Sequence, residues 1–137
     1  MDLKAAPDES VSGESGIDFK RKIESMIASG SVAFSLSLGI NLGLFQTLSV
    51  LKSPASPTYI AKQAGCNDRF LREWLFHMVV AGIVEMDNNG TRYFLPKHRA
   101  KMLLSEGAAD LTTFLPSTGT LFKSLLHSFK TGNTTGE

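Results

Sequence analysis

The stretch RFLREWLFHMVVAGIVE at residues 69–85, together with YFLPK at 93–97, decides the fold of this chain. Apolar residues recur at helical spacing through the first part, while charged residues gather on the other side. Asn67 precedes this part as an N-cap, and Asp68 is an acidic first-turn residue that suits the helix dipole. We therefore expect a helix that begins after Asn67 and stops at Gly82.

After this helix the pattern changes from helical to strand-like. The runs at 83–86 and 92–95 flank the segment DNNG at 87–90. Asn-Gly between two such runs is a strong hairpin signal, because both residues tolerate a positive φ. We expect a β-hairpin that ends at Pro96, followed by a short helix over 98–104.

A second, shorter helix precedes the long one. Ser56 is an expected N-cap with Pro57 at the first helical position, where its missing N–H costs nothing. This helix covers 58–63 and is stopped by Gly65. A short helix, a turn, a longer helix and a hairpin in this order predict a winged helix-turn-helix.

Three more helices are expected nearer the N-terminus. An amphipathic helix runs from Ile17 towards Gly30, an almost wholly apolar one follows over 32–38, and a third covers 41–51. No charged residue stands between Glu24 and Lys52, a span long enough for a membrane helix. Its serines, glycines, asparagine and glutamine favour helices buried by their own domain or by a partner instead.

The expected fold class is mainly α with a small β-hairpin, a winged helix-turn-helix with extra N- and C-terminal helices. A further helix is expected over 110–129, interrupted near Pro116. The domain boundaries follow from this order. They are a disordered tail at 1–16, the winged-helix domain at 17–104, a helical linker at 105–130 and a frayed tail at 131–137.

The composition narrows the class of protein. With 137 residues, 42% hydrophobic and 20% charged, the chain fits one globular domain with tails. The net charge of +1 gives no general attraction to nucleic acids or acidic membranes. Cys66 is the only cysteine, so no intramolecular disulfide is possible, and we expect a reducing, cytoplasmic location without membrane attachment.

Winged helices often bind DNA, so the number and placement of basic residues in this motif indicate whether it could do so. The second helix of the motif carries Arg69 and Arg72, but Glu73 stands beside both. The wing tip has no cation, and the best remaining basic cluster is Lys97, Arg99 and Lys101, whose simpler interpretation is a solvated helix face. We expect nucleic acid not to bind, and keep a stand-alone DNA-binding regulator as the alternative function.

No catalytic or metal-binding constellation is visible. His77, His98 and His127 lack metal-ligand spacing, and Cys66 has no local activating partner. No strand leads into a glycine-rich phosphate loop. We therefore expect no catalytic, metal or cofactor-binding residue in this chain.

The same stretches carry a family resemblance. NLGLFQTL at 41–48, RFLREWLFHMVVAGIVE and YFLPK resemble the N-terminal winged-helix domain of class I S-adenosylmethionine-dependent methyltransferases that act on small molecules. The resemblance covers about 19–130. It implies an assembly domain that also roofs the substrate cavity, followed by a Rossmann-like domain that holds S-adenosylmethionine. Because the sequence ends at Glu137, we expect a truncated form without the cofactor site, which by itself is inactive as a methyltransferase.

Two sets of residues follow from this resemblance and from the uncharged helices. Contiguous apolar surface of this kind usually marks an interface, and we expect a homodimer or a contact with the missing domain. Its residues would be Phe34, Leu36, Leu38, Leu42 and Phe45, with ordinary core as the equally weighted alternative. The substrate lid would be formed by Phe114, Leu115 and Phe122.

Overall fold

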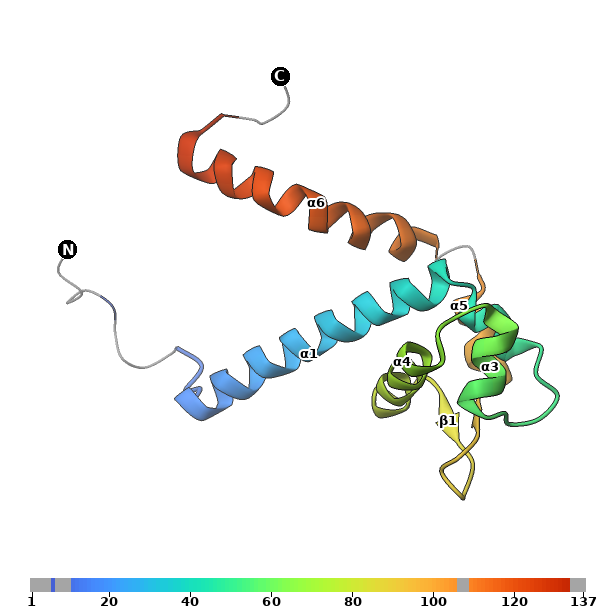
Figure 1. Ribbon diagram of the computed structural model, residues 1–137. Coiled ribbons are helices and arrows are strands. Elements are labelled where there is room, and N and C mark those ends of the chain that lie inside the picture. Colours follow the sequence, from blue (N-terminus) through green and yellow to red (C-terminus); the bar gives the residue numbers. More distant parts are fainter. Residues whose placement is uncertain (1–5, 7–10, 106–108, 134–137) are drawn as a thin grey trace. The chain divides into compact units, whose positions relative to one another are not determined.

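The computed structural model describes residue 6 and residues 11–105 and 109–133. The chain is mainly helical with one small β-hairpin, which confirms the predicted fold class (Figure 1). Most of the expected tail at 1–16, residues 106–108 of the expected linker and 134–137 of the expected frayed tail lie outside the described residues. The elements are α1 (Gly16–Asn41), α2 (Leu44–Ser49), α3 (Pro57–Ala64), α4 (Asp68–Val80), β1 (Glu85–Met86), β2 (Tyr93–Phe94), α5 (Lys97–Leu103) and α6 (Ala109–Thr131).

The chain divides into two compact units, residues 1–31 and residues 32–137. In the first unit, α1 begins after Ser15, whose hydroxyl accepts a hydrogen bond from the Asp18 amide at 3.2 Å and so acts as an N-cap. The second unit begins inside α1 at residue 32. It contains the rest of α1, the winged helix and α6.

The helix-turn-helix forms as its local signals predict. The Ser56 side chain accepts a hydrogen bond from the Tyr59 amide, with Pro57 at the first position of α3. Gly65 ends α3 in the left-handed conformation, with a φ of 67°. The Asn67 side chain caps α4 by accepting from the Phe70 amide at 3.2 Å, and α4 ends just before Gly82.

The wing is shorter than expected, and its turn differs. β1 and β2 pair antiparallel over two residues each, with Glu85 opposite Phe94. Only Gly90 of the Asn-Gly pair has a positive φ, and its amide donates to the Asp87 carbonyl. The Asp87 carboxylate accepts hydrogen bonds from the Thr91 and Arg92 amides and closes the loop. The predicted hairpin therefore forms with Gly90 in the left-handed conformation and with Asp87 supplying hydrogen bonds to the turn.

A single core joins α2, α3, α4, the wing and α5. Its fully buried side chains include Phe45, Ile60, Leu75 and Met78. The Phe45 and Trp74 rings pack at 5.4 Å between centroids and 57° between planes. The Trp74 indole Nε1–H donates to the Ser35 carbonyl at 2.9 Å and ties the C-terminal half of α1 to α4.

The N-terminal region differs from the expectation of two helices separated near Gly30. α1 runs without interruption from Gly16 to Asn41. A single glycine inside a helix costs about 1 kcal/mol, which leaves the helix intact when its neighbours are good helix formers. The break falls at Gly43 instead, which has a φ of 68°.

The C-terminal helix also differs from the expectation. α6 is continuous from Ala109 to Thr131, so the predicted interruption near Pro116 was wrong. Proline removes one backbone donor and bends a helix without having to end it. The Thr118 hydroxyl donates to the Leu115 carbonyl at 2.7 Å within this turn.

By length and composition alone, α1 is apolar enough to cross a membrane, and core helices of soluble proteins meet the same criterion. Only 17% of its most apolar window is buried within the chain. Whether this helix is covered by its own domain or by a partner stays a prediction.

Gly39 marks the closest approach of α1 to the aromatic core pair. A β-carbon built there would lie 2.5 Å from Trp74 and 2.8 Å from Phe45, both ring atoms. We expect Gly39→Ala to lower the free energy of unfolding by about 1–3 kcal/mol, because the two rings have no room to retreat in a packed core. Urea unfolding followed by circular dichroism measures the change. The control Gly30→Ala, in open space on the same helix, should be neutral or stabilising. Equal losses in both variants would contradict the packing.

Candidate functional site

The exposed face of α4 is the surface with which a winged helix would read DNA. Arg69 faces Glu73 at 3.8 Å, and Arg72 faces Asp68 at 3.4 Å. Both pairs are solvent-exposed and contribute little stability. They nevertheless place a carboxylate beside each guanidinium, which offsets the positive potential that a phosphate backbone requires.

In the wing and α5, one basic residue is paired with an acid and others are exposed. Arg99 is held at 3.1 Å from the Glu85 carboxylate, and it donates to the Ile83 carbonyl at 3.3 Å. This half-buried guanidinium clamps α5 to the wing. Lys97 and Lys101 remain exposed, whereas the wing turn is organised around the Asp87 carboxylate.

We expect no measurable binding of random duplex DNA by this chain at physiological salt. The reason is the pairing of the arginines on α4 with acids, which leaves no concentrated cationic patch on the described face of this helix. An electrophoretic mobility shift at several salt concentrations measures this. Micromolar binding that falls steeply with rising salt would show that the winged helix reads nucleic acid after all.

The other side of α4 is joined to α1. The Ser35 hydroxyl and His77 Nδ1 form a hydrogen bond of 2.8 Å, so His77 has a packing role. His98 and His127 are exposed, and Cys66 is half-buried with its sulfur near the Ala64 carbonyl. Within the described part of the chain, no group of three or more His, Cys, Asp or Glu side chains could hold a metal ion.

The predicted interface residues separate into two groups. Phe34, Leu38 and Leu42 are 58%, 42% and 52% exposed and follow one another at intervals of four along and just beyond α1. We call these three residues the α1 stripe. A small pocket of about 250 Å³, lined almost entirely by apolar atoms, opens beside Phe34 and Leu38.

The other two predicted interface residues lie elsewhere. Phe45 is fully buried against Trp74, so its assignment to an interface was wrong: it belongs to the core. Leu36 is half-buried and packs against that same core. Sequence alone does not separate these residues from the α1 stripe, because all of them stand in an uncharged apolar run.

The predicted lid residues all fall on α6. Leu115 is half-buried and Phe122 is 62% exposed. Phe114 lies within the helix, but its side chain is outside the described residues. Further along α6, exposed apolar side chains recur on one face: Leu121, Leu125, Leu126 and Phe129.

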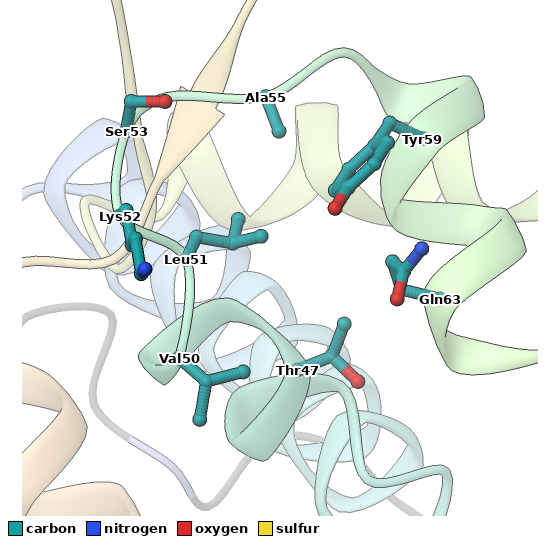
Figure 2. A pocket seen from close by; sticks show the side chains of 8 residues that line it. All are labelled: Thr47, Val50, Leu51, Lys52, Ser53, Ala55, Tyr59 and Gln63. Atoms are coloured by element: carbon teal, nitrogen blue, oxygen red, sulfur yellow. The ribbon is translucent and has the colours of Figure 1, made fainter.

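Sequence reasoning missed a pocket of about 400 Å³ between α2, α3 and the loop that joins them (Figure 2). Tyr59 and Gln63 reach into it from α3, and Leu51 faces them from the loop (Figure 2). Lys52 lies on the same loop and also lines an adjoining pocket of about 310 Å³, together with Lys97. No sequence pattern marks these residues, because they come together only through the packing of α2 on α3.

The described residues do not provide a Rossmann-type cofactor site. Such a site needs a glycine-rich loop between a strand and a helix. The two strands are two residues long and pair only with each other and with Ala55. The segment between them closes on Asp87, and no helix follows it directly.

Helix-turn-helix, wing and flanking helices together define a winged helix-turn-helix domain. The family model of the Rv2258c-like winged HTH domain matches residues 30–105. The chain therefore belongs to the family of Rv2258c-like winged HTH domains. A comparison with curated protein sequences returns no match.

Solved structures share this fold over their N-terminal parts. The mitomycin 7-O-methyltransferase MmcR matches with a TM-score of 0.67 and 19% identity over 83% of this chain and 34% of its own. The dimethyltransferase RosA from Streptomyces davawensis matches with a TM-score of 0.66 and 20% identity, over 88% of this chain and 35% of its own. LepI in complex with SAM matches with a TM-score of 0.65 and 22% identity, over 83% of this chain and 28% of its own. The chain thus spans about a third of the length of these proteins.

Proposed function

We propose that this chain is the assembly and substrate-covering domain of an S-adenosylmethionine-dependent methyltransferase. The observation that carries the proposal is the α1 stripe, an apolar face that the described chain leaves uncovered. The fold it shares with MmcR and RosA, both methyltransferases by name, supports the reaction class.

The proposed assembly is a homodimer in which α1 packs against α1 of a second copy. With 26 residues, α1 is about 39 Å long, enough for an extended helix-to-helix contact. Exposed apolar side chains continue towards its N-terminus at Phe19, Ile23 and Met26. No charge interrupts the helix after Glu24, so two copies bury no unpaired ion when they meet.

The covering role falls to α6. Its exposed apolar face, from Leu121 to Phe129, is the kind of surface that packs against another domain or roofs a cavity. We propose that this face meets the domain that binds the cofactor. LepI and PigF were solved with SAM and SAH respectively, and the proposed cofactor here is S-adenosylmethionine, held by residues other than those of this chain.

Sedimentation equilibrium of the chain at micromolar concentrations tests the assembly part of the proposal. We expect a mass near twice 14.8 kDa. If the chain is a monomer at high concentration, the proposed dimer is contradicted and does not cover the α1 stripe. Titration calorimetry with S-adenosylmethionine tests the proposal that residues outside this chain hold the cofactor. Micromolar binding to this chain alone would contradict it.

A further inference from the structure

We propose that the two adjoining pockets around the loop 51–54 bind a small molecule that carries one anionic group on an apolar body. The larger pocket has a volume of about 400 Å³ and the smaller one about 310 Å³. Each volume falls within the range of small-molecule sites in proteins. They share Leu51, Lys52 and Ser53, so one loop forms a wall of both.

The charge of the lining points to an anion. Lys52 and Lys97 are the only charged side chains among the described residues that line either pocket. Neither ammonium forms an ion pair with any side chain that the structure describes, unlike Arg69, Arg72 and Arg99. Two unpaired cations without a neighbouring acid in the lining therefore attract a carboxylate or a phosphate.

The remaining lining fits the body of such a ligand. Val50, Leu51 and Ala55 supply an apolar surface in the larger pocket. The Tyr59 side chain and the Gln63 amide face this hollow from α3 and can donate to an anionic or carbonyl oxygen (Figure 2). A few polar groups converging over an apolar floor are typical of ligand sites.

The walls are held in place before any ligand arrives. Ala55 exchanges two backbone hydrogen bonds with Tyr93, at 3.0 Å and 2.8 Å, which anchors the loop to β2. The Ser56 cap fixes the first turn of α3, on which Tyr59 stands. Preformed walls lower the ordering cost of binding.

Nuclear magnetic resonance titration of the ¹⁵N-labelled chain with 1-naphthoate tests this site. We expect amide shifts over 47–63 and 94–97, and the same shifts at higher concentration in Lys52→Gln, with affinity reduced about fivefold. The double variant Lys52→Gln/Lys97→Gln should lose more than tenfold. Lys62→Gln, which removes a lysine of α3 that lines neither pocket, should bind as the unchanged chain does.

Two further ligands complete the test. 1-Naphthyl phosphate shows which anion is preferred, and tighter binding of either anion supports the site. Equal binding of the uncharged 1-naphthylmethanol would overturn the proposal, as would shifts confined to α1 or an affinity that Lys52→Gln leaves unchanged. Since both lysines are exposed, these variants should keep the fold, and their unchanged amide spectra elsewhere verify it.

Discussion

Truncating Phe45 to alanine should lower the free energy of unfolding by about 3–5 kcal/mol. The ring is fully buried, packs on Trp74 and lies under Gly39, so its removal leaves a cavity that helix backbone borders on one side. A domain of this size is stable by about 5–15 kcal/mol, so this one change removes a large share of the total. Urea unfolding monitored by Trp74 fluorescence and by circular dichroism measures it.

Phe76→Ala is the matched control for this prediction. It removes the same side chain from α4, where the ring is 59% exposed, and should change the stability by less than about 0.5 kcal/mol. Comparable losses in the two variants would mean that Phe45 is not the core residue described above. A loss of dimer without a loss of stability in Phe45→Ala would restore its predicted place in an interface.

The second large effect concerns assembly. Leu38→Asp should weaken the proposed dimer at least about a hundredfold, because a two-fold contact would bury the new carboxylate twice without a partner. Leu38 is exposed in the described chain, so the monomer should retain its fold. Sedimentation over a range of concentrations gives the dissociation constant, and circular dichroism verifies the helix content.

Phe76→Asp serves as the control for this variant, since it places the same charge on an exposed apolar position of α4 outside the α1 stripe. It should leave the dissociation constant unchanged. If both variants dissociate equally, general charge repulsion is responsible. If neither does, the two copies meet through another surface, of which the exposed face of α6 is the next candidate.

The local signals of the sequence predicted much of the fold. Ser56 and Asn67 cap α3 and α4 as expected, and Gly65 and Gly82 mark their ends. These features could be predicted because caps and left-handed glycines act within a few residues of one another. The expected breaks at Gly30 and Pro116 were wrong because neither residue ends a helix unless the chain also turns there.

The candidate site was predicted less well. An uncharged run offers no polar face, so its periodicity does not show which apolar residues turn inward. The packing of Trp74 on Gly39 decides this, since it places Phe45 in the core and leaves the α1 stripe outside. The pocket beside Lys52 was not predicted, because its walls, α2, α3 and the loop between them, face one another only once α3 packs on α2.

The sequence by itself determined the winged helix-turn-helix and its resemblance to methyltransferase N-terminal domains, since both rest on short-range patterns of caps, turns and helical spacing. Only the tertiary structure decided which apolar side chains remain exposed, that Arg99 of α5 pairs with Glu85 of the wing, and that Lys52 and Lys97 line one pocket. These properties depend on contacts between residues far apart in the chain, and burial and charge pairing are settled only when those residues pack together.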